Sequence, residues 1–125
     1  MRKKEITLCG KKVTLTYCYA TEINYKILSD EDIADFMTDA QQAITDKKMP
    51  DVKKSILLII AAMQPHYELT GKNMPLDDKA LMLNLSPEEL GTAIGTIIGL
   101  RAEFYYIPSG EPKDSKRRGT TRPKA

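Results

Sequence analysis

The stretch EITLCGKKVTLTYCYA, residues 5–20, decides how the chain begins to fold. Apolar and polar side chains alternate before and after Gly10, which is the pattern of two strands that each bury one face. Glycine at the first central position of a two-residue turn, here Gly10 followed by Lys11, favours a type II′ hairpin. Such a turn would place Leu8 opposite Val13. We therefore expect an N-terminal β-hairpin that needs helices, or a further strand, to pack against.

Two short helices are expected after the hairpin. Thr21 is the candidate cap of the first helix, whose apolar residues are Ile23, Ile27 and Leu28. Ser29 is the candidate cap of the second, because acidic residues follow it at once. The second helix then carries apolar residues at helical spacing, namely Ile33, Phe36, Met37, Ala40 and Ile44.

An aliphatic helix is expected over residues 50–64, and the width of its apolar stripe places it centrally in the fold. Pro65 is expected to end it, because proline has no N–H to donate in a helix interior. Residues 66–75 then form a loop, and residues 76–84 support a short helix.

The strongest local signal is the sequence SPEE, residues 86–89. Ser86 is a helix cap, Pro87 suits the first helical position, and Glu89 completes a capping box. The helix that starts here runs to about Tyr106.

With 125 residues, 42% hydrophobic and 29% charged, the chain has the size and composition of one folded domain. We expect a mostly α-helical α+β domain over residues 1–110, with four to five helices after the hairpin. Residues 111–125 hold six basic and two acidic residues and almost no apolar ones, so a disordered basic tail is expected there. The tail carries a net charge of +4, and residues 1–110 carry −2.

Little in the sequence indicates catalysis. The single histidine, His66, and the two cysteines, Cys9 and Cys18, lack metal-ligand spacing. We expect free thiols, a structural histidine, no metal, no cofactor and no enzyme activity. The longest apolar run is shorter than a membrane span and no signal peptide is seen, so a cytoplasmic location without membrane contact is expected.

Three glycines, Gly91, Gly95 and Gly99, fall four apart on the last helix. Each costs about 1 kcal/mol of helix stability relative to alanine, so something is expected to approach the backbone there. The simpler interpretation is close packing on a neighbouring helix within the fold. The other is a groove or a self-association surface.

Two charged segments and one apolar segment remain. The acidic stretch from Asp30 to Asp39 does not fit a calcium loop, because Ala34 and Asp35 stand where such a loop needs an oxygen ligand and glycine. It is interpreted as a solvated helix face, with a docking surface for a basic partner as the alternative. The segment FYYI, residues 104–107, either closes the core or forms an exposed partner-binding patch.

The order of these elements resembles the tail assembly chaperones of long-tailed (siphovirus-type) bacteriophages and prophages. The resemblance rests on the hairpin EITLCGKKVTLTYCYA with its glycine–basic turn, the helices TEINYKILS and DVKKSILLIIAAM, and the capped helix LSPEELGTAIGTIIGL. It covers about residues 5–107.

The resemblance implies a non-enzymatic, self-associating protein of the bacterial host cytoplasm that is absent from the mature virion. Such chaperones bind the long, hydrophobic tape-measure protein and help to recruit tail tube protein. The residues expected to contact a partner are the glycine stripe with Ile94, Ile97, Ile98 and Tyr105, or the hairpin edge.

A nucleic-acid-binding regulator that uses the basic tail is the alternative hypothesis. Nucleic acid is the less favoured partner, because the tail lacks aromatic residues that stack on bases.

Overall fold

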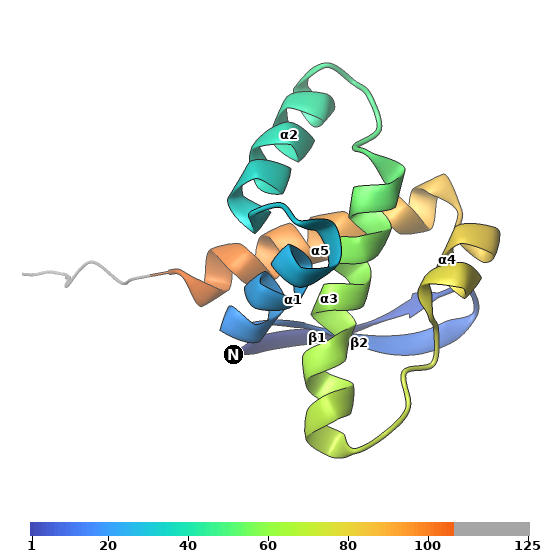
Figure 1. Ribbon diagram of the computed structural model, residues 1–125. Coiled ribbons are helices and arrows are strands. Elements are labelled where there is room, and N and C mark those ends of the chain that lie inside the picture. The colour runs from blue at the N-terminus through green and yellow to red at the C-terminus, as the bar shows by residue number, and fades with distance from the viewer. Residues whose placement is uncertain (107–125) are drawn as a thin grey trace, which may run out of the picture.

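The computed structural model describes residues 1–106 and shows an N-terminal antiparallel β-hairpin followed by five helices, as the sequence predicted (Figure 1). The expected tail, residues 111–125, lies outside the described residues. The elements are β1 (Arg2–Leu8), β2 (Lys11–Tyr17), α1 (Tyr19–Ser29), α2 (Ile33–Thr45), α3 (Val52–Thr70), α4 (Asp78–Asn84) and α5 (Pro87–Phe104).

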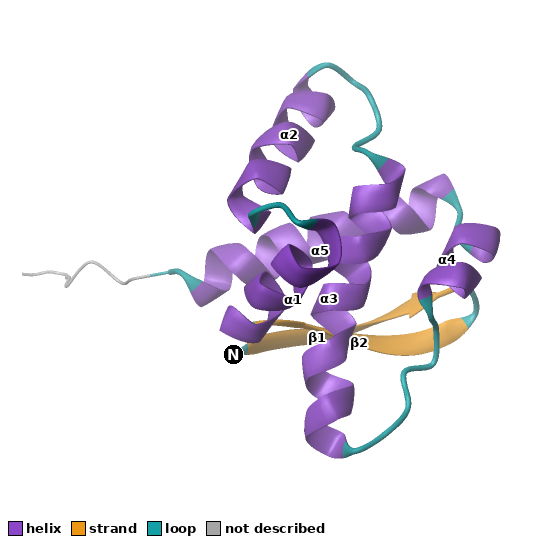
Figure 2. Cartoon of the chain, in the orientation of Figure 1, coloured by secondary structure: helices purple, strands orange, loops and turns teal. Residues whose placement is uncertain are grey.

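The helices α3 and α5 pack in a layer against the apolar face of the hairpin. Figure 2 shows α2 at the top of the view and the hairpin in the lower half, where α3 crosses in front of it. α3 packs on β2, α5 packs on both strands, and α3 and α5 pack on each other. The inward face of the hairpin, with Leu8, Val13, Leu15 and Tyr17, is completely buried under these helices.

The hairpin register differs from the prediction by two residues. Ile6 lies opposite Val13, and the turn residues are Cys9 and Gly10 rather than Gly10 and Lys11. Both turn residues have positive φ, 52° and 76°, as a type I′ turn requires. The predicted type II′ turn is therefore wrong, but the two-residue shift keeps every side chain on its expected face.

The caps of α1 and α2 also differ from the prediction. α1 begins three residues earlier than expected, with Cys18 as its cap, and Thr21 is buried in its first turn, where its hydroxyl donates to the Thr16 carbonyl at 2.7 Å. Ser29 is the last residue of α1 rather than the cap of α2, which is Asp32. α1 buries Thr21 and Tyr25 and leaves Ile23 and Ile27 exposed, contrary to the apolar pattern.

Pro65 does not end the aliphatic helix, which continues to Thr70 and stops at Gly71. A proline at this position leaves the carbonyl of Ala61, four residues earlier, without its helical donor. The Asn24 side-chain amide of α1 donates to this carbonyl at 3.4 Å. α1 thus supplies the missing hydrogen bond, and α3 continues beyond Pro65.

The capping box of α5 is present as predicted. The Ser86 hydroxyl accepts from the Glu89 amide at 3.1 Å, and the Glu89 carboxylate accepts from the Ser86 amide at 3.2 Å. The helix ends at Phe104, where its ring meets the Tyr17 ring with 5.6 Å between centroids. Among the described helices, none combines the length and the apolar character that crossing a bilayer demands.

Candidate partner-binding surfaces

Two adjoining apolar hollows lie along one side of α5. One, of about 220 Å³, lies between the C-terminal part of α2 and α5. The other, of about 180 Å³, lies between the start of α3, α4 and α5. Met49 and Leu90 line both hollows, so the two form one continuous surface. We call it the apolar groove and define it by Ile44, Met49, Val52, Met82, Leu90 and Ile98.

Four large apolar side chains of the groove keep about half of their surface in water. The exposed fractions are 59% for Ile44, 49% for Met49, 53% for Val52 and 55% for Met82. Scattered exposed apolar residues are ordinary on a monomer, but a gathered patch is typical of an interaction site. Two of the four are methionines, whose flexible, polarisable side chains adapt to the shape of a partner.

The segment between α2 and α3 contributes Met49 to the groove and is held by two hydrogen bonds. The Lys48 amide donates to the Ala43 carbonyl at 2.8 Å, which folds the end of α2 back on itself. The Asp51 carboxylate then caps α3 by accepting from the Lys54 amide at 2.9 Å. These two bonds hold the backbone on either side of Met49, and Lys48 also lines the hollow between α2 and α5.

The glycine stripe lies open on the surface of α5. A methyl group added at Gly91, Gly95 or Gly99 would meet nothing within 4 Å. Close packing on a neighbouring helix within the fold is therefore wrong for this stripe. The other interpretation, a groove or self-association surface, stays open.

The three isoleucines predicted to contact a partner lie in different surroundings. Ile97 is completely buried and Ile94 is 3% exposed, so both belong to the core beneath α5. Ile97 offers no surface to a partner, contrary to the expectation. Ile98 is half-buried and lines the groove, where the edge of Ile94 also contributes to the floor.

Tyr105 lies in an aromatic cluster that closes the end of α5. Its hydroxyl donates to the Glu22 carboxylate at 2.5 Å, and the same carboxylate accepts from Tyr17 at 2.7 Å. The hydrogen bond to Glu22 raises the pKa of Tyr105 to about 12. The Arg101 guanidinium lies 5.4 Å from the Tyr105 ring centroid. Tyr105 is thus held by the fold, although its ring remains partly exposed.

The histidine and the two cysteines are the residues of the described part of the chain that the sequence offered for metal binding or nucleophilic chemistry. The His66 ring meets the Tyr67 ring at 4.9 Å, and Cys9 and Cys18 are half-buried free thiols, as expected. Burial raises the pKa of the Cys9 thiol, and the Glu89 carboxylate adds to this, which is the opposite of activation as a nucleophile. Across residues 1–106, no three potential ligands gather in the way that a metal site requires.

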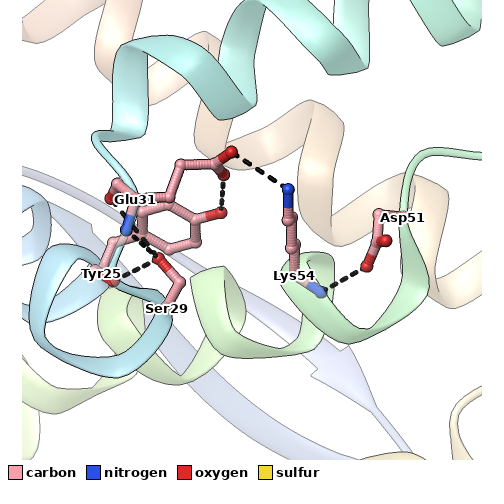
Figure 3. A network of polar contacts seen from close by, with 5 residues as sticks. All are labelled: Tyr25, Ser29, Glu31, Asp51 and Lys54. Carbon is pink, nitrogen blue, oxygen red and sulfur yellow. Dashed lines mark hydrogen bonds and ion pairs between the residues drawn. The ribbon is translucent and has the colours of Figure 1, made fainter.

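Part of the acidic stretch is structural. Figure 3 shows Glu31 between Tyr25 and Lys54: its carboxylate accepts from the Tyr25 hydroxyl at 2.7 Å and from the Lys54 amine at 3.1 Å. Asp32 pairs with Lys26 on the surface at 3.5 Å. Asp35 and Asp39 face solvent from α2, so the interpretation as a solvated helix face describes these two residues.

Sequence reasoning missed most of the apolar groove. The helical period places Ile44 and Val52 on the apolar stripes of their helices, but it does not show where a helix runs past the core. Met49 lies in the connection between two expected helices, and Met82 lies in the expected helix over residues 76–84, whose exposed face the sequence does not identify.

Comparison of the chain with protein-family models, with curated proteins and with solved structures finds no match.

Proposed function

We propose that this chain is a non-enzymatic tail assembly chaperone of a long-tailed bacteriophage or prophage, and that it holds an apolar helical segment of the tape-measure protein. The observation that carries the proposal is the apolar groove, where four half-exposed apolar side chains from α2, α3, α4 and the connection after α2 face one surface. The resemblance of the hairpin and the capped last helix to that family adds the identity of the client.

The physics of the groove suits a helical client. An amphipathic helix binds a hydrophobic groove through apolar residues spaced three or four apart, and Ile44, Met49, Val52 and Met82 offer the opposing contacts. Fully burying one such side chain contributes about 1.5 to 3 kcal/mol. Because these four are already half-buried, each groove binds weakly, and many copies along one long client would gain affinity by multivalency.

The direct test is co-expression of the chain with a tape-measure protein from the same phage or prophage. The wild-type chain is expected to keep the client soluble and to co-purify with it. Ile44→Lys and Val52→Lys place a charge in the groove and are expected to abolish co-purification. Leu69→Lys is the matched control, because Leu69 is 74% exposed at the far end of α3 and does not line the groove.

Two results would contradict the proposal. A folded wild-type chain that leaves the client insoluble excludes the chaperone function. Equal co-purification by the two groove variants and by the control excludes the groove as the binding surface. Retention on DNA at low salt that disappears when residues 111–125 are removed would favour the nucleic-acid regulator instead.

A further inference from the structure

The two edges of the hairpin are not equivalent. On β2, the outward amide of Thr14 donates to the Tyr67 hydroxyl at 3.2 Å, and the outward carbonyl of Thr16 accepts from Thr21 at 2.7 Å. Two directly opposite residues of an antiparallel pair either bond to each other or both point their backbone groups away from the pair, so Glu5 and Lys3, which lie opposite Thr14 and Thr16, point theirs outward from β1.

The edge of β1 is open. Within the described residues, no group bonds to the backbone of Lys3, Glu5 or Thr7, the three positions that point outward. An open strand edge of this kind is a template for another strand. A two-stranded sheet is also marginal by itself, and additional strands stabilise it.

The glycine stripe of α5 runs beside this open edge. Lys4 of β1 and the three glycines line one shallow trough of about 370 Å³, together with Glu103. A strand added to β1 would extend the sheet beneath this flank of α5. Gly91, Gly95 and Gly99 have no side chains, so this flank of α5 has free space beside β1. A methyl group added at any of the three positions would meet nothing within 4 Å.

We propose that a second copy of this chain occupies the open edge: the two β1 strands pair antiparallel into a four-stranded sheet, and the two α5 helices pack through their glycine stripes. This inference does not depend on the chaperone function.

The charges of β1 favour a second copy in one register. Lys3 and Glu5 lie on the same face and both point their backbone groups outward. Antiparallel pairing that sets Lys3 of one copy opposite Glu5 of the other makes two oppositely charged cross-strand pairs. Lys4 then lies on the two-fold axis, beside the glycine stripe. The two Lys4 charges oppose this arrangement, and Glu103 in the same trough is the carboxylate available to offset them.

The helix spacing also fits a second copy. α5 packs on both strands of the hairpin, so it lies over the seam between them. With neighbouring strands about 4.8 Å apart, the two α5 axes of a four-stranded sheet would lie about 10 Å apart. Packed helices lie about 8–10 Å apart, and glycine at the contact allows the closer end of that range.

The test is sedimentation velocity of the full chain over a wide concentration range. The wild-type chain is expected to show a monomer–dimer equilibrium. Glu5→Pro removes one outward amide that the hairpin itself does not use, and is expected to weaken dimerisation at least tenfold. Lys12→Pro is the matched control, because it removes an outward amide from the other edge, and it is expected to leave the dimer unchanged.

Charge exchange tests the register. Lys3→Glu alone places acidic residues opposite each other and is expected to weaken the dimer several-fold. The double variant Lys3→Glu/Glu5→Lys restores opposite charges across the pair and is expected to restore the dimer. No restoration would overturn the register.

Substitutions in the glycine stripe are expected to stabilise the monomer and to weaken the dimer. Gly95→Ala improves helix propensity and meets no neighbour in the monomer, so the monomer is expected to melt at a higher temperature. Gly95→Leu fills the contact and is expected to weaken the dimer at least tenfold while circular dichroism shows an intact fold. A wild-type chain that stays monomeric at all concentrations, or a dimer unaffected by both Glu5→Pro and Gly95→Leu, overturns the proposal.

Discussion

Glu89 joins the start of α5 to the turn of the hairpin, 80 residues earlier. One carboxylate oxygen accepts from the Ser86 amide and completes the capping box, while the other accepts from the Cys9 amide at 2.9 Å. Cys9 has a φ of 52°, a left-handed conformation that is uncommon for a residue with a side chain. Its amide also points away from the strand ladder, so Glu89 satisfies the group that the turn leaves unpaired.

Glu89→Ala is therefore expected to destabilise both the helix start and the hairpin turn. Glu88→Ala is the matched control, since Glu88 is exposed in the same first turn and makes none of these bonds. Thermal unfolding should show a clear drop in melting temperature for the first variant and little change for the second. Equal melting temperatures would contradict the tertiary role of Glu89.

The same carboxylate predicts a pH effect. Hydrogen bonds from the Ser86 and Cys9 amides lower the pKa of Glu89 below its usual 4.5. A lowered pKa in the folded state stabilises the protein above pH 4.5, and this stabilisation is lost as the pH falls through the lowered value. The stability difference between wild type and Glu89→Gln should therefore narrow in acid. Chemical denaturation at several pH values measures it, and a constant difference would refute the assignment.

The bond from Asn24 to Ala61 explains why Pro65 is tolerated in α3, and a double-mutant cycle tests this. Asn24→Ala is expected to cost about 1 kcal/mol, because it leaves a carbonyl without a donor. In a Pro65→Ala background the helix supplies its own donor, so the same change should cost much less. Urea unfolding of the wild type, the two single variants and the double variant gives the coupling free energy between the two positions. Additive changes in the unfolding free energy would show that the Asn24 hydrogen bond does not compensate for the proline.

Tyr25 is completely buried and donates to Glu31. Tyr25→Phe is expected to cost about 2 kcal/mol, since the lost bond has a charged acceptor. Tyr106→Phe is the control, because Tyr106 is exposed. Burial, with the hydrogen bond to Glu31 second, raises the pKa of Tyr25 above its usual 10.0. This stabilisation is full below pH 10 and is lost as the pH rises further.

The difference in unfolding free energy between wild type and Tyr25→Phe should thus narrow above pH 10. A difference that stays the same from neutral to alkaline pH would count against the bond.

The fold class was predictable because its signals are local. Alternation before and after Gly10 indicates two strands, and the SPEE sequence indicates a helix start, with no need of distant residues. The turn position was not predictable in the same way. Glycine alone does not distinguish the two turn centres, and the bond that favours Cys9 comes from Glu89.

The surfaces were less predictable than the fold. Helical spacing shows that Ile94, Ile97 and Ile98 share one side of α5, but which of them is covered depends on where the hairpin and α3 lie. The glycine stripe was recognisable as unusual, yet its exposure follows only from the absence of a helix over that flank in the described fold. Pro65 failed as a stop signal because a residue of another helix replaces its missing bond.

The groove is tested most directly by NMR of methionine methyl groups in the full chain, with a peptide copied from an apolar helical segment of the tape-measure protein. Met49 and Met82 line the groove and are half-exposed, whereas Met63 is completely buried elsewhere in the core. The signals of Met49 and Met82 should shift in a saturable way as peptide is added, while that of Met63 stays in place. Saturable binding that leaves the signals of both groove methionines unchanged, or no binding at any peptide concentration, would show that the groove does not bind the client.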